Sequence, residues 1–136
     1  MEPLAGKERA SRKGPLAGFR VVDCSTVLAG PYCTMMLGDL GADAVKVERP
    51  AGGDGSRHWG PPFAEGESAY YLQVNRSKRS IALDLKQPQA LEVAARLAAG
   101  ADVVSENFLP GATERYGLDY TALSSTNPGL VYCSIR

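Results

Sequence analysis

The sequence has no surplus of charge of either sign, no apolar run of membrane-spanning length and no secretion-type apolar stretch. Because 15 basic residues balance 15 acidic ones, no overall field favours nucleic acid or an anionic membrane as a partner. The cysteines, Cys24, Cys33 and Cys133, are odd in number and widely spaced in apolar runs, which favours reduced thiols over disulfides or a zinc site. We therefore expect an intracellular protein of a reducing compartment, the cytoplasm or the mitochondrial matrix, with no metal.

The length of 136 residues is enough for one domain with its own core. Residues 1–17, MEPLAGKERASRKGPLA, combine scattered charges with two prolines and two glycines. This composition predicts a flexible leader. A remnant of a mitochondrial targeting segment is the alternative, although its two acidic residues count against it. We expect residues 18–136 to form the folded part.

Short apolar runs alternate with helical segments after the leader. The run FRVVDCS, residues 19–25, is unbroken and rich in β-branched residues, as a buried parallel strand is. Pro31 suits the first turn of a helix expected from Tyr32 to Leu40, and Gly41 supplies a left-handed stop. The run DAVKVE, residues 43–48, is expected to be the second strand.

The alternation repeats in the second half of the chain. A loop rich in glycine and proline leads to YYLQVN, a segment whose type the sequence leaves open. Beyond it we expect the strands RSIALDL, ADVVSEN and LVYCSI and the helices QALEVAARLAA, GATERYG and TALSST. Strands and helices that alternate at this spacing predict an α/β fold, namely a Rossmann-like, mostly parallel sheet with helices on both faces.

Polar and basic groups gather where the expected strands end. Ligands of open α/β sheets bind outside the carboxyl ends of the strands. Those ends carry Ser25–Gly30, Arg49, Asp84–Lys86, Asn107–Phe108 and, shortly afterwards, Arg115. Arginine forks suit phosphate oxygens and lysine adds a point charge, while the apolar side chains among these residues could flank a base. The G-x-G-x-x-G motif of dinucleotide-binding turns is absent, so the ligand is still open at this point.

Each of these residues also has a plainer interpretation. An arginine at a strand end is often a solvated surface charge, Gly30 could serve only close packing of helix on sheet, and Asp84 could cap a loop. His58, the single histidine, fits a solvated loop residue better than a catalytic base. The arrival of several such groups at successive strand ends favours a ligand site over separate explanations.

Four motifs occur together in this sequence, namely LAGPYCTMMLGDLGADAVKVERPAGGD, the loop with Arg57 and WGPP, NRSKRSIALDLK and ADVVSENFLPGATERYGL. As a linked set they resemble the class III coenzyme A transferases, the family of formyl-CoA transferase, carnitine CoA-transferase and the α-methylacyl-CoA racemases. The resemblance covers nearly all of residues 15–136. The long GDGSRHWGPPF loop resembles the branch that contains succinate–hydroxymethylglutarate CoA-transferase, because the racemases are shorter here.

The resemblance implies acyl-CoA and carboxylate substrates, with coenzyme A held by the strand ends. The implied coenzyme A contacts are Val27, Leu28, Ala29, Arg49, Leu83, Asp84, Leu85, Lys86, Asn107, Phe108, Leu109 and Arg115. Leu28 departs from relatives that carry a polar residue there, so only a backbone contact is expected at that position. These positions coincide with the strand ends that the sheet geometry singles out.

The resemblance also implies that the catalytic residue lies outside this chain. Family members attack the thioester with an aspartate carboxylate, and that aspartate follows a glycine-rich segment after YCSI, past residue 136. We therefore expect residues 18–136 to be the N-terminal part of a coenzyme A-binding domain, inactive alone, from a longer protein that forms an interlaced homodimer. An acyl-CoA racemase and a non-catalytic coenzyme A-binding fragment are the alternatives. The strand LVYCSI, apolar on both faces, is expected to belong inside a larger sheet.

Overall fold

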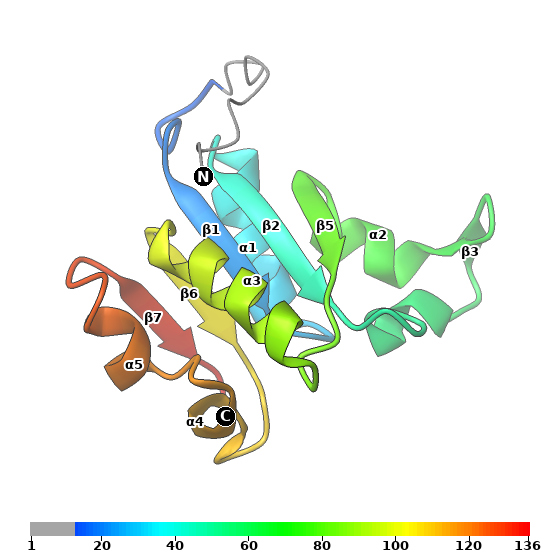
Figure 1. The fold of residues 1–136 in the computed structure, drawn as a ribbon. Helices are drawn as coiled ribbons and strands as arrows, with labels where there is room; N and C mark the ends of the chain where they lie inside the picture. Colours follow the sequence, from blue (N-terminus) through cyan, green and yellow to red (C-terminus); the bar gives the residue numbers. More distant parts are fainter. Residues whose placement is uncertain (1–12) are drawn as a thin grey trace.

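The computed structural model describes residues 13–136, whose centre is a five-stranded sheet (Figure 1). All neighbouring strands of this sheet run parallel, in the order β5-β2-β1-β6-β7. The strands are β1 (Arg20–Cys24), β2 (Asp43–Glu48), β5 (Lys78–Ala82), β6 (Val103–Glu106) and β7 (Val131–Ser134). The α/β class and the mostly parallel sheet that the sequence predicts are confirmed.

Helices cover both faces of the sheet. Helix α1 (Ala29–Asp39) lies behind the sheet in Figure 1 and contacts β1 and β2, while α3 (Pro88–Ala99) crosses the front face. Helix α2 (Ala69–Asn75) packs against α1. Two short helices, α4 (Ala112–Tyr116) and α5 (Tyr120–Ser124), connect β6 to β7. The sheet is therefore the middle layer of three.

Local sequence signals explain several helix ends. Pro88 is the first residue of α3, where its missing N–H costs no helical hydrogen bond. Gly41, with a φ of +106°, provides the left-handed residue that ends α1. The Ser68 hydroxyl accepts a hydrogen bond from the N–H of Tyr71 and so caps α2.

The core has one part on each face of the sheet. In front, Val22 and Val104 pack with Ala94 of α3 in the larger cluster of buried side chains. Behind, Val21 and Ala44 form a smaller cluster beneath α1. Because both faces of the central strands are covered, these strands read in the sequence as nearly continuous apolar runs.

Several elements differ from their expected bounds. The segment YYLQVN is helical, as part of α2, and RSIALDL forms a shorter strand, because β5 ends at Ala82. Helix α1 begins at Ala29, so Pro31 is its third residue. The Gly/Pro-rich loop contains a one-turn helix and a small antiparallel hairpin that the sequence did not suggest. These are η1 (Gly55–His58), β3 (Phe63–Ala64) and β4 (Glu67–Ser68).

The remaining expectations concern the leader, residues 1–17, and the last strand, LVYCSI. Residues 1–12 of the expected leader lie outside the described residues, and residues 14–18 form a turn. In that turn the N–H of Leu16 donates to the carbonyl oxygen of Leu40 at 3.0 Å. Strand β7 lies at one edge of the described sheet, and Val131 on it is 60% exposed.

Candidate functional site

A cavity of about 400 Å³ opens at the carboxyl ends of β1, β2 and β5 and beside the segment that follows β6. Its walls come from segments far apart in the sequence. They comprise Cys24, Thr26, Val27, Lys46, Val47, Glu48, Arg49, Gly53, Asp54, Gly55, Leu83, Asp84, Leu85, Lys86, Phe108 and Tyr116. The walls combine apolar side chains with three cations and three carboxylates, as a small-molecule site combines apolar surface with a few polar groups.

The connections of the chain diverge at this cavity. From β1 the chain passes through α1 to β2 on one side, and from β5 it returns through α3 to β6 on the other side of β1. The strand order therefore reverses between β1 and β6, and such a switch point is where doubly wound sheets bind ligands. Val27 follows β1 and Phe108 follows β6, and both line the cavity.

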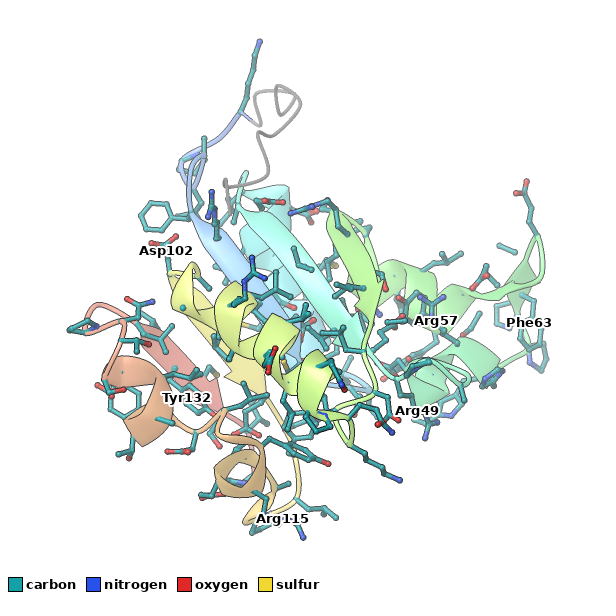
Figure 2. All side chains as sticks on the ribbon, viewed as in Figure 1. Arg49, Arg57, Phe63, Asp102, Arg115 and Tyr132 are labelled. Atoms are coloured by element: carbon teal, nitrogen blue, oxygen red, sulfur yellow. The ribbon has the colours of Figure 1, made fainter. Side chains whose placement is uncertain are left out.

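Most of the site residues predicted from the sequence lie together around the cavity. Those in its walls are Val27, Arg49, Leu83, Asp84, Leu85, Lys86 and Phe108. The predicted residues outside its walls are Leu28, Ala29, Asn107, Leu109 and Arg115. Leu109 is 79% exposed, and Figure 2 shows Arg115 on α4 at the bottom of the view, apart from Arg49 near the end of β2. Leu28 and Ala29 adjoin Val27 where α1 begins, and Asn107 is bound to Thr26. Leu109 and Arg115 belong to an exposed outer segment that follows Phe108.

The cations predicted to bind phosphate have no carboxylate partner in the part of the chain that the structure describes. Arg49, Lys86 and Arg115 are exposed, and none forms an ion pair within residues 13–136. Arg49 donates from Nε to the carbonyl oxygen of Gly53 at 2.8 Å. The N–H of Lys86 donates to Asp84 Oδ1 at 3.1 Å, in a turn after β5. An anionic ligand could recruit these cations without breaking an internal ion pair.

The β1–α1 turn, residues 25–29, has its first backbone amides occupied by the protein itself. The N–H groups of Ser25, Thr26 and Val27 donate to side-chain oxygens at 2.9, 2.9 and 3.3 Å. The acceptors are, in that order, Asp23, Asn107 and Asp54. These three amides are not free to cradle a phosphate, as the amides of glycine-rich nucleotide-binding turns are. The phosphates of a ligand would therefore have to bind side-chain cations or the later amides at the start of α1.

Val27 occupies an unusual backbone conformation within this turn. Its φ is +72°, in the left-handed region that a β-branched residue rarely adopts because its Cβ crowds the backbone. Such a conformation costs on the order of 1–3 kcal/mol and persists only where neighbouring groups fix it. Here Asp54 accepts from the N–H of Val27, and Asn107 Nδ2 donates to the carbonyl oxygen of the preceding Thr26 at 3.0 Å.

Two buried lysines and two buried carboxylates lie behind the turn. Lys46 Nζ lies 3.0 Å from Asp54 Oδ2 and 4.0 Å from Asp23 Oδ2, and its side chain is 1% exposed. It also donates to the carbonyl oxygen of Ser25 at 2.8 Å. Lys78 Nζ, from β5, lies 2.8 Å from Asp23 Oδ2. Each buried charge has an opposite partner, and removal of one would leave another uncompensated.

The titration of these groups follows from their surroundings. Burial alone would raise the pKa of Asp23, but the charges of Lys46 and Lys78 outweigh it and hold that pKa below its usual range. Burial likewise opposes ionisation of Asp54, whose pKa is lowered by hydrogen bonds from Ser56 and by the charge of Lys46. Both carboxylates are ionised at neutral pH. Burial and the charge of Asp23 raise the pKa of Cys24 to about 12, so this thiol is no nucleophile at neutral pH.

Gly30 marks the closest approach of α1 to the turn. A Cβ at this position would lie 2.1 Å from Ser25 Oγ, closer than any packing allows. The Ser25 hydroxyl in turn donates to Asp23 Oδ1. The packing explanation for Gly30 therefore holds, because a larger residue would push Ser25 away from Asp23.

Arg57 fastens the segment that contains η1, the hairpin and α2 to the sheet. Its Nη2 lies 2.7 Å from Glu48 Oε2 at the end of β2, and its guanidinium lies over the ring of Tyr71, 3.8 Å from the centroid. The Tyr71 hydroxyl donates to Glu48 Oε1 at 3.1 Å, and burial together with the charge of Glu48 raises the pKa of this tyrosine. Trp59, two residues beyond Arg57, is 48% exposed and its ring lies 5.2 Å from that of Tyr70.

Sequence reasoning did not single out Lys46 and Asp54, although both line the cavity. One signal for Lys46 was present, because it interrupts an apolar run expected to be a strand buried on both faces. A lysine in such a strand must find a charged partner. Nothing in the local sequence identifies that partner, since Asp54 lies eight positions later in a glycine-rich loop and the pairing depends on the fold.

Comparison with known proteins gives the family. The model of CoA-transferase family III matches residues 16–136. The chain belongs to CoA-transferase family III. It is 50% identical over 121 residues to succinyl-CoA:glutarate CoA-transferase of Mus musculus and 53% identical over 131 residues to succinate–glutarate CoA-transferase of Agrobacterium fabrum. These matches cover 89% and 92% of this chain but 28% and 33% of the relatives, so the chain spans about a third of their length.

Solved structures agree with this membership. A CAIB/BAIF family protein from Brucella suis superposes with a TM-score of 0.84 at 50% identity, covering 89% of this chain and 33% of that one. The protein Rv3272 of Mycobacterium tuberculosis superposes with a TM-score of 0.80 at 42% identity, over 92% of this chain and 33% of its own. The resemblance to the class III family is confirmed.

Two features are absent from residues 13–136, a membrane-spanning helix and a metal-binding cluster. None of the helices there is both long and apolar enough to span a bilayer. Within the same residues, no group of three or more histidine, cysteine, aspartate or glutamate side chains is placed to hold a metal ion.

Proposed function

We propose that this chain is the coenzyme A-binding part of an acyl-CoA:carboxylate CoA-transferase. The enzyme would move coenzyme A from an acyl-CoA such as succinyl-CoA to a dicarboxylic acid. The observation that carries the proposal is the strand-end cavity at the switch point, which combines apolar side chains with two exposed cations, Arg49 and Lys86, that form no ion pair within residues 13–136. The names of the relatives from Mus musculus and Agrobacterium fabrum, a succinyl-CoA:glutarate and a succinate–glutarate CoA-transferase, support the reaction class.

The adenine of coenzyme A would bind to the apolar side chains of the cavity, and its phosphates would bind to the cations. The apolar side chains of Leu83, Leu85 and Phe108 offer flat or branched surfaces on which adenine can pack. Arg49 and Lys86, at the rim of the same cavity, would bind the phosphates through charge-assisted hydrogen bonds. Arg115, on the exposed outer segment, would add a third cation from the far side of the switch point.

Retention of coenzyme A is the contribution of this part of the enzyme to the reaction. In the mechanism that the family implies, an aspartate beyond residue 136 attacks the thioester carbonyl and displaces coenzyme A as a thiolate, which leaves a mixed anhydride. Coenzyme A must stay bound while its sulfur leaves and attacks again. Groups that hold the nucleotide would therefore prevent loss of the anhydride to water. The interlaced homodimer and the cytoplasmic or mitochondrial location stay predictions.

Calorimetric titration of the full-length protein with coenzyme A tests the site. We expect Arg49→Ala and Lys86→Ala each to weaken binding about ten- to a hundredfold, because each removes a charge-assisted contact of about 1.5–3 kcal/mol. Binding of pantetheine, which lacks the nucleotide, should not change in these variants. Arg96→Ala is the matched control. Arg96 is exposed in the last turn of α3, whereas Lys86 precedes the first turn of the same helix. Unchanged coenzyme A affinity in both cavity variants would refute the assignment.

The reaction itself is tested by mixing the full-length protein with succinyl-CoA and glutarate. The expected products are glutaryl-CoA and succinate in equal amounts, resolved by chromatography. An acyl-CoA racemase would instead leave the acyl group on its coenzyme A and scramble the α-carbon configuration of a branched acyl-CoA. That outcome without any exchange would overturn the transferase proposal and leave the coenzyme A site standing.

A further inference from the structure

We propose that Asp54 is a positioning residue for coenzyme A binding, because it holds Val27 in the left-handed conformation that shapes one wall of the cavity. The inference rests on the proposed function, since it concerns how the same site keeps its form. Asp54 belongs to the loop before η1, and the turn that it holds follows β1. The two segments meet only through the fold.

The first argument is the conformation of Val27. With a φ of +72°, this β-branched residue is held where it would not stay unaided. Its N–H donates to both carboxylate oxygens of Asp54, at 3.3 and 3.5 Å, and its side chain lines the cavity. Relaxation of φ to a negative value would reorient the peptide groups on either side of Val27 and so change the backbone of the wall that a ligand meets.

The second argument is that Asp54 is itself fixed. The residue is 2% exposed, and its Oδ1 accepts from the N–H and the hydroxyl of Ser56 at 2.9 and 2.8 Å. Lys46 Nζ lies 3.0 Å from its Oδ2. A lone carboxylate in the wall of this cavity would repel a phosphate, and the buried lysine compensates that charge. The carboxylate oxygens of Asp54 accept from Ser56, Lys46 and Val27, so we expect the residue to act on a ligand through the turn that it holds.

This arrangement predicts a specific rescue. Glycine adopts a positive φ about as readily as a negative one. In a Val27→Gly background the turn therefore no longer needs Asp54 to keep the left-handed conformation. We expect Asp54→Ala to weaken coenzyme A binding at least tenfold in the full-length protein, and Val27→Gly alone to weaken it by a smaller factor, because it removes only the side-chain contact and keeps the backbone of the turn. The double variant should bind within about threefold of Val27→Gly.

A control and a conservative variant accompany these measurements. Asp39→Ala removes an exposed carboxylate at the far end of α1, where it pairs with Arg76, and should leave coenzyme A affinity unchanged. Asp54→Asn keeps the shape and one acceptor oxygen, so its loss of affinity should be smaller than that of Asp54→Ala. If Asp54→Ala does not fold, Asp54→Asn with and without Val27→Gly carries the same comparison. A double variant no better than the Asp54 variant alone would overturn the proposal.

A second measurement needs no ligand. Amide hydrogen exchange followed by NMR should show Val27 protected in the wild-type protein and exchanging at least tenfold faster in Asp54→Ala. The amide of Val22 in β1 is the internal reference, because a general loss of stability would accelerate both. Unchanged exchange at Val27 would overturn the inference. If the wild-type protein binds no coenzyme A, the proposed function fails, while this exchange measurement still decides whether Asp54 holds Val27.

Discussion

The two segments that flank the switch point are built in opposite ways. The β1–α1 turn, residues 25–29, has its first three amides bound by side chains and two buried lysines behind it. The β6–α4 segment, residues 107–115, is held near its start, where the N–H of Phe108 donates to Glu106 Oε2 at 2.8 Å. Farther along it, Leu109 is 79% exposed and Arg115 has no ion-pair partner within residues 13–136.

This contrast separates two tasks of a binding site. The turn is fixed before any ligand arrives, so little ordering free energy has to be spent there on binding. In the β6–α4 segment Asn107 is bound to Thr26 of the turn, but Leu109 and Arg115 are exposed and can be directed to a ligand. Substitution of the buried lysines behind the turn should therefore act mainly on folding, and substitution of the exposed residues of the β6–α4 segment mainly on affinity.

The largest expected effect is on the stability of the turn. Lys46→Met removes one member of the buried network and leaves Asp54 and Asp23 with less compensating charge. We expect the free energy of unfolding to fall by about 3–5 kcal/mol, measured by urea denaturation. Arg115→Met, at an exposed cation of similar length, should change it by less than about 0.5 kcal/mol. Equal effects at the two positions would remove the distinction between the segments.

The next largest effect is expected in the β6–α4 segment and concerns affinity. Arg115→Ala should weaken coenzyme A binding by about 1.5–3 kcal/mol, or ten- to a hundredfold, because a charge-assisted phosphate contact is lost. Its thermal midpoint should match that of the wild-type protein. Unchanged affinity in calorimetry would remove Arg115 from the site. The control variant Arg96→Ala should bind coenzyme A as the wild-type protein does.

The smallest effect concerns pH. The pKa values of Asp54 and Asp23 are lower in the folded protein than their ordinary value of 3.8, so the unfolded chain binds protons first as pH falls. The stability that these groups contribute is complete above about pH 5 and declines below pH 4, by about 1.4 kcal/mol for each unit of pKa shift. Urea denaturation at pH 7, 5, 4 and 3 measures it. Asp54→Asn should flatten the decline, whereas Arg115→Ala should not alter it.

The exposed and apolar parts of this architecture were predictable from the sequence. Apolar runs predicted the strands β1 and β2, and Pro88 predicted the start of α3. The positions of Arg49, Lys86 and Phe108 at the ends of strands predicted that the three residues lie close together. These inferences succeed because they depend on local periodicity and on one general rule about parallel sheets.

The groups that fix the turn were not predictable in the same way. The contact of Asp54 with Val27 and Lys46 joins three segments whose meeting depends on the complete strand order. The positive φ of Val27 also contradicts its own preference, since a valine after a strand favours extended backbone. Propensity reasoning fails where tertiary contacts impose a conformation, and such positions concentrate at functional sites.

The contact between Arg57 and Glu48 can be followed by tryptophan fluorescence. Trp59 is the single tryptophan of the sequence, and it lies two residues beyond the guanidinium that fastens its segment to Glu48. Trp59 lies beside Tyr70 and can accept excitation energy from that ring. Because it is half exposed, its emission wavelength depends on how much water surrounds it. Trp59 is therefore a built-in fluorophore close to the contact between Arg57 and Glu48. A change in its emission wavelength would report separation of the segment with η1, the hairpin and α2 from the sheet, without any added label.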